Sequence, residues 1–241
     1  MKTKKPTSRR DRVGLVVFAF LCVGVAIVSP LPYLLLGSSA QAWAEADGGL
    51  TEFYAEKSTF IRSTLMVHAA ASGVALLLTP LQASTKLRRR VPVVHRVSGR
   101  VSALAIVVGA ISAVIIAPGG YAGLSGAIGF SGLAIAWLYC LQRSISAARA
   151  KRLATHREWG LRVIALSFAA VTLRLWLGLY IGFAAAIGGL APDQAFDQVY
   201  VTMPFVSWIP NLLIVEWYLR RNRSATAPQT AIADLGPVTV A

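Results

Sequence analysis

Charged residues are scarce in this sequence, and cysteine is nearly absent. Asp, Glu, Lys and Arg make up 14% of the 241 residues, whereas ordinary globular chains carry about 25%. Two cysteines cannot form the disulfide framework of a small secreted protein. A soluble nucleic-acid-binding protein would be basic and polar, but this chain has a net charge of +14 and is 56% apolar. The combination indicates an integral membrane protein whose positive charges lie in short loops.

Long apolar runs predict six membrane-spanning helices. A spanning helix needs about 20 apolar residues. Six segments fit, near residues 13–37, 63–83, 101–117, 127–146, 163–188 and 203–219. Strand-like alternation is absent, and the runs are too long for barrel strands. We therefore expect an all-α fold, a polytopic helical bundle that occupies residues 13–219.

Lys and Arg lie almost entirely in alternate loops. Of the 24, 21 lie in residues 1–12, after spans two and four, or directly after span six. By the positive-inside rule, this bias predicts a bacterial inner-membrane protein with both termini in the cytoplasm. The same charges would meet anionic lipid headgroups, so the net charge requires no nucleic acid.

The two ends of the chain carry separate expectations. Residues 1–12 form a basic cytoplasmic N-terminus, and residues 220–241 are expected to be a disordered cytoplasmic tail. The first apolar run and Ala42-Trp43-Ala44 imitate a signal peptide with its cleavage site. Because that run is about twice the usual length and contains two prolines, we expect residues 1–44 to be retained.

Spans two to five contain an internal repeat at offsets of 59 to 61 residues. The matching pairs are Ser72-Gly73 with Ser131-Gly132, Leu81-Gln82 with Leu141-Gln142, and His95-Arg96 with His156-Arg157. Parallel repeats are related by an axis along the membrane normal. The repeat predicts a four-helix core with a pseudo-two-fold axis, in which His95 and His156 lie at the same height.

His95 and His156 have three interpretations. They could order the basic loops at the lipid headgroups, bind a phosphate with the neighbouring arginines, or ligate one haem b whose propionates Arg100 would help to neutralise. Three histidines cannot supply two bis-histidine haems. The chain has no Cys-rich cluster and no other metal motif, so no metal site is predicted, and the cofactor stays open.

Four polar residues lie inside the predicted spans, where ionisable groups are costly and face the protein interior or water. Arg174 would lie roughly 18 Å from the inner membrane edge. We expect it to contact Asn211, with Glu216 reaching up from below, either as a structural pair or as an anion or proton site. His68 is expected to hydrogen-bond another helix, with a haem or metal ligand and a proton relay as alternatives.

Several short pieces occur in a fixed order between His68 and Trp217. They are Leu76-Leu77-Leu78-Thr79-Pro80-Leu81-Gln82, Leu87-Arg88-Arg89-Arg90, His95-Arg96, His156-Arg157-Glu158-Trp159, Ala169-Ala170-Val171-Thr172-Leu173-Arg174-Leu175 and Pro210-Asn211-Leu212-Leu213. With these pieces the chain resembles the bacterial domain-of-unknown-function 2306 family of predicted membrane proteins. Gly160 departs from the family pattern, which has a methionine after that tryptophan. The resemblance implies an architecture and a location, but no reaction.

The residues leave three classes of function open. The first is an uncharacterised membrane protein with a binding or scaffold role. The second is a b-type haem protein that transfers electrons through His95 and His156. The third is a small proton-coupled transporter that uses His68, Arg174 and Glu216. No reaction, and therefore no enzyme class, follows from the sequence.

Overall fold

A computed structural model describes residues 9–46 and 49–224, and within these residues the chain is helical and contains no strand. The expectations for the first eight residues and for the tail beyond Ser224 concern parts of the chain outside the described residues. The helices are α1 (Arg9–Val28), α2 (Leu31–Leu36), α3 (Ala40–Glu45), α4 (Gly49–Ala55), α5 (Thr59–Ala83), α6 (Thr85–Arg90), α7 (Pro92–Ile116), η1 (Ala117–Gly119), α8 (Gly123–Arg149), α9 (Leu153–Ser167), α10 (Ala169–Gly188), α11 (Pro192–Tyr200), α12 (Met203–Val206) and α13 (Ile209–Ser224).

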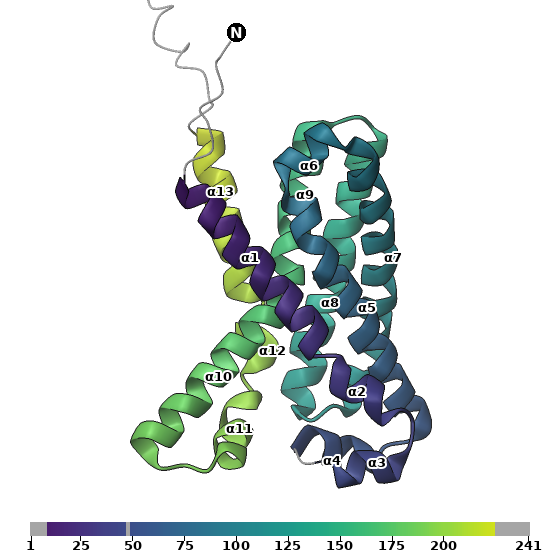
Figure 1. Ribbon diagram of the computed structural model, residues 1–241, viewed down its shortest axis with the longest axis vertical. Helices are drawn as coiled ribbons and strands as arrows, with labels where there is room; N and C mark the ends of the chain where they lie inside the picture. Colours follow the sequence, from purple (N-terminus) through teal and green to yellow (C-terminus); the bar gives the residue numbers. More distant parts are fainter. Residues whose placement is uncertain (1–8, 47–48, 225–241) are drawn as a thin grey trace, which may run out of the picture.

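The centre of the molecule is a ring of four long helices (Figure 1). Helix α5 packs on α7, α7 on α8, α8 on α9, and α9 returns to α5. Small side chains such as Ala75, Ala105, Ala110 and Ala134 line the core between them, because small residues let membrane helices approach closely. The ring contains the predicted spans two, three and four, but its fourth helix is α9, whereas most of the predicted fifth span (163–188) is α10, which lies outside the ring.

Two long segments lie outside the ring. Helix α1 crosses α10, as Figure 1 shows, and the rings of Phe18 and Phe168 stack with centroids 5.2 Å apart. Helices α10 and α11 form a hairpin that diverges from the ring, and Gly189 ends α10 in the left-handed conformation that favours glycine. Helices α2, α3 and α4 cover the end of the ring on which α5 begins.

Five helical segments are long and apolar enough to cross a membrane, and a sixth counts if the bent pair α11 and α12–α13 is one span. That pair bends by 67°. Large apolar side chains remain on the outer surfaces, among them Phe20, Leu104 and Leu124, as expected where lipid is the solvent. The protein is thus an all-α membrane bundle.

Helices α7 and α9 begin well before the charge-free stretches at 101 and 163. Their first turns carry basic residues such as Arg96 and Arg157. Lys and Arg mark the depth of the headgroups rather than the end of a helix, since their long side chains can extend towards the interface. Arg162 was counted from the sequence among the basic residues at the junction of spans four and five. In the structure it lies inside α9.

Candidate functional site

The polar residues singled out in the sequence fall into two groups at opposite ends of the bundle. The Arg174 cluster consists of Tyr33, Tyr54, His68, Arg174 and Tyr200, at the end covered by α2, α3 and α4. The second group contains Arg162 of α9 and Glu216 of α13, which form an ion pair with each other. A single site made of His68, Arg174 and Glu216 is therefore not what the fold provides.

Arg174 is the only basic residue of α10 and lies in its first half. Its Nη1 donates to the carbonyl of Ala170 in the same helix at 2.9 Å. Its electrostatic neighbours are the hydroxyl groups of Tyr33 and Tyr200 and the imidazole of His68. The ion pairs of the described residues do not include it, so its charge has no carboxylate partner there. The residue as a whole is exposed on the surface of α10.

His68 is fixed from a neighbouring helix, as the sequence predicted. Its Nδ1 donates to the Gly109 carbonyl of α7 at 2.8 Å. Helices α5 and α7 come very close there, because a Cβ on Gly109 would lie 2.7 Å from Ser72 Oγ. With the proton on Nδ1, the Nε2 of the neutral imidazole is an acceptor.

Two tyrosines at this end of the bundle lie outside the spans: Tyr54 of the Arg174 cluster and Tyr121. Burial raises the pKa of Tyr54 to about 12. Tyr121 donates to Asp197, and this hydrogen bond is the main reason that its pKa is also raised to about 12. The ring of Tyr121 contacts those of Phe53 and Tyr200. This aromatic group was not predicted from the sequence, because tyrosines near a membrane interface ordinarily belong to the aromatic belt.

Asn211 does not contact Arg174, and this expectation was wrong. The Asn211 Nδ2 donates to Thr172 Oγ1 at 2.9 Å, to the Ser207 carbonyl at 3.1 Å and to the Ala165 carbonyl at 3.3 Å. The helix is interrupted between α9 and α10, where the Ala165 carbonyl faces α13. Asn211 therefore links α13 to the break between α9 and α10. Such a break is tolerated inside a membrane where a side chain hydrogen-bonds the backbone groups that the helix leaves unpaired.

Glu216 does not reach up towards Arg174 either. It forms a two-point ion pair with Arg162, from Nε to Oε1 at 2.5 Å and from Nη2 to Oε2 at 2.9 Å. The Arg162 guanidinium also lies over the Trp159 ring, 4.4 Å from its centroid. This pairing was not predicted, because Arg162 and Glu216 are 54 positions apart in the sequence.

His95 and His156 come near enough to interact electrostatically, at the end of the bundle where α7 and α9 begin. The Nδ1 of His156 lies 3.0 Å from both Ser144 Oγ and the Ser144 carbonyl, whereas the buried Nδ1 of His95 has no partner among the described residues. Arg100 is exposed.

A bis-histidine haem needs a porphyrin-sized space between its two ligands. Two surface hollows lie on α5–α7 and on α10, and neither is lined by His95 or His156. The described residues also contain no group of three or more His, Cys, Asp or Glu that could hold a metal ion. Nothing in this arrangement supports a haem at the pair, and the haem stays a prediction from the sequence.

The family comparison agrees with the resemblance noted in the sequence. The family described as "Predicted membrane protein (DUF2306)" matches residues 65–219. The match covers the four-helix ring and most of α13, including Arg162, Arg174 and Glu216. Comparisons with curated proteins and with solved structures gave no match.

Proposed function

Since the chain belongs to the domain-of-unknown-function 2306 family of predicted membrane proteins, we propose a function that rests on its own side chains: it binds an amphiphilic carboxylate within the membrane. One observation carries the proposal. Arg174 is an exposed arginine in a membrane-spanning helix, and no carboxylate pairs with it among the described residues. A charge in such a position is costly unless a counter-charge or water compensates it.

The surroundings of Arg174 favour a ligand with one negative charge. The site supplies one guanidinium, the neutral hydroxyl groups of Tyr33 and Tyr200, and the imidazole of His68. Arginine binds a carboxylate through two parallel hydrogen bonds, and phenol hydroxyls can donate to the same oxygens. A carboxylate matches this charge, whereas a doubly charged phosphate would leave one charge uncompensated.

An open apolar hollow further along α10 from Arg174 favours a ligand with an acyl chain. Gly178 and Gly182 follow Arg174 at intervals of four residues and therefore share its side of α10. They line a hollow of about 600 Å³ together with Trp176, Leu179, Tyr180 and Phe183. A Cβ on either glycine would meet no atom within 4 Å, so this surface is open. The acyl chain would lie here with its head at Arg174.

Carboxylate binding to the purified full-length protein tests the proposal. We expect the thermal midpoint to rise with decanoate more than with hexanoate, because each buried methylene contributes about 0.8 kcal/mol, roughly fourfold in affinity. Arg174→Ala should abolish the shift. Gly178→Leu should fill the hollow and reduce the shift with decanoate more than that with hexanoate.

Two variants serve as matched controls. Arg100→Ala removes an exposed arginine elsewhere, and Gly24→Leu fills an open glycine position on α1. Both should retain the decanoate shift. Equal shifts in wild-type protein and Arg174→Ala would contradict the proposal. Uptake of the carboxylate into proteoliposomes, if lost in Arg174→Ala, would extend the proposal from binding to transport.

We also infer that the chain makes six spans in a bacterial inner membrane, with both termini in the cytoplasm. The distribution of Lys and Arg supports this orientation. It would place the Arg174 cluster in the outer half of the membrane and the basic loops against anionic lipid headgroups. This function requires no haem at His95 or His156.

A further inference from the structure

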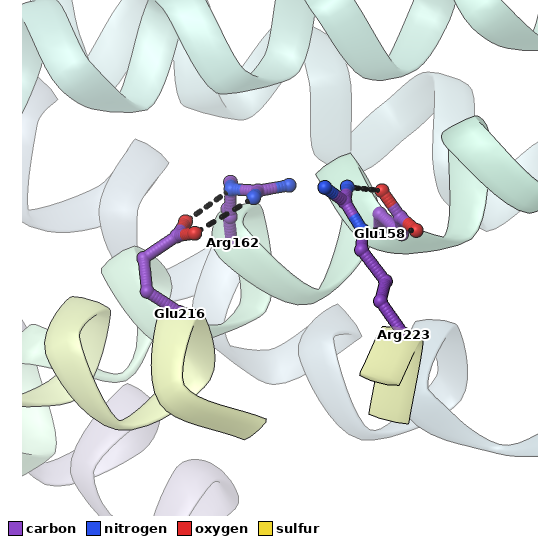
Figure 2. A network of polar contacts seen from close by, with 4 residues as sticks. All are labelled: Glu158, Arg162, Glu216 and Arg223. Atoms are coloured by element: carbon purple, nitrogen blue, oxygen red, sulfur yellow. Dashed lines mark hydrogen bonds and ion pairs between the residues drawn. The ribbon is translucent and has the colours of Figure 1, made fainter. Parts of the chain in front are cut away.

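Four charged side chains form a row at the end of the bundle opposite Arg174. Figure 2 shows Glu216 paired with Arg162 on one side and Glu158 paired with Arg223 on the other. Arg223 Nε donates to Glu158 Oε1 at 3.2 Å, and its Nη2 donates to Oε2 of the same carboxylate. The carboxylates occupy the outer positions of the row, and the two guanidinium groups point toward one another between them.

Arg162 is buried and has an unused donor. The residue keeps 9% of its surface exposed. Its Nε and Nη2 are bound to Glu216, but the buried Nη1 has no partner among the described residues. A buried donor without an acceptor costs about 1–3 kcal/mol. In Figure 2 this unpartnered end of Arg162 is the end directed toward Arg223.

Two guanidinium groups that face one another repel unless an anion lies between them. Arg223 is accessible, since its side chain is 62% exposed, so an anion can enter from its side. Arg220 adds a third positive charge, which interacts electrostatically with Glu216. The Trp159 ring, also on α9, packs against the Arg162 guanidinium and holds it in place.

We propose that the gap between Arg162 Nη1 and the Arg223 guanidinium binds a phosphate group. Phosphate oxygens accept from several arginine donors at once, and arginine is the side chain best suited to such contacts. The phosphate is that of an anionic lipid headgroup or a free phosphate from the adjoining aqueous phase. This site is independent of the carboxylate site at Arg174, which lies towards the other end of the bundle.

Titration of inorganic phosphate into the purified full-length protein tests the site. Because loss of Arg162 would break a buried ion pair and could unfold the chain, the exposed Arg223 is the residue to change. Arg223→Ala should weaken phosphate binding at least tenfold, about 1.4 kcal/mol. Arg223→Lys should weaken phosphate binding less than Arg223→Ala does, since the positive charge remains and only the paired donors of the guanidinium are lost. Glu158→Gln should retain binding, because the cation stays and only its competing carboxylate is neutralised.

A second arm distinguishes the two sources of phosphate. The protein is placed in nanodiscs of phosphatidylcholine with and without phosphatidylglycerol, and the lipid retained by the protein is measured by mass spectrometry. Preferential retention of phosphatidylglycerol that Arg223→Ala removes identifies a lipid headgroup, and Arg223-dependent binding of inorganic phosphate alone identifies the free ion. If neither depends on Arg223, the proposal is overturned. Arg174→Ala should keep wild-type phosphate affinity, and its loss there would also overturn this site.

Discussion

At the scale of single residues, Tyr121 gives a measurable pH dependence. Its hydrogen bond to Asp197 raises its pKa to about 12 from an ordinary value near 10. A raised pKa means that the folded state favours the protonated phenol, so the stabilisation is complete below pH 10 and is lost as the pH rises through about 12. Asp197→Asn removes the negative charge and should lower the Tyr121 pKa towards its ordinary value. The absorbance of tyrosinate during alkaline titration measures this shift.

The same titration needs an assignment, because the chain contains seven tyrosines. Tyr121→Phe provides it, since the difference between the wild-type and Tyr121→Phe curves is the contribution of Tyr121. Tyr54 also has a pKa of about 12, but burial is the main cause of its shift. Asp197→Asn should therefore leave the Tyr54 transition in place. Identical Tyr121 curves with and without the Asp197 carboxylate would refute the role of that hydrogen bond.

At the scale of helices, Gly129 controls the contact between α8 and α12. A Cβ on Gly129 would lie 2.4 Å from Pro204 Cβ and 2.8 Å from the Pro204 carbonyl oxygen, so the backbone of α12 would have to move. Overpacking of this kind costs about 1–3 kcal/mol. We expect Gly129→Ala to lower the free energy of unfolding by about that amount, as measured by denaturant titration in detergent.

Gly132 is the matched control on the same helix. A Cβ at Gly132 would lie 3.7 Å from Trp208 Cζ2, which is an ordinary contact. Alanine in place of glycine also favours a helix by up to about 1 kcal/mol. Gly132→Ala should therefore be neutral or mildly stabilising. If the two alanine variants unfold alike, the close contact at Pro204 does not control packing between α8 and α12.

The arrangement of the elements also shows how far sequence reasoning extends. Apolar runs were enough to predict the helical bundle, because lipid imposes long apolar helices. They did not predict that α9, rather than α10, completes the four-helix ring. The partners of Asn211 and Glu216 were not predictable. Asn211 donates to the Ala165 carbonyl beside the break between α9 and α10, and no local sequence pattern predicts that break. Glu216 pairs with Arg162, which the distribution of Lys and Arg in the sequence placed at the junction of two spans rather than inside a helix.

At the scale of the whole molecule, the orientation in the membrane can be tested with single cysteines. Cys22 and Cys140 are buried, so a cysteine-free background replaces both with alanine. A membrane-impermeant thiol reagent added to spheroplasts should label Glu56→Cys and Asp193→Cys, which are exposed positions on the side with few basic residues. Arg90→Cys and Arg152→Cys lie exposed in the basic loops and should react only after the membrane is permeabilised.

This labelling pattern also decides which compartment supplies each proposed ligand. The expected result gives the carboxylate access to Arg174 from outside the cell and the phosphate access to Arg223 from the cytoplasm. Denatured samples provide the control, since all the introduced cysteines should then react equally. Labelling of Arg90→Cys in intact spheroplasts would reverse the orientation and exchange the two compartments. An added Arg221→Cys, at an exposed position near the end of α13, should stay unlabelled in intact spheroplasts. Its labelling there would mean that α11 and α13 do not form one span, and the chain would then cross the membrane five times.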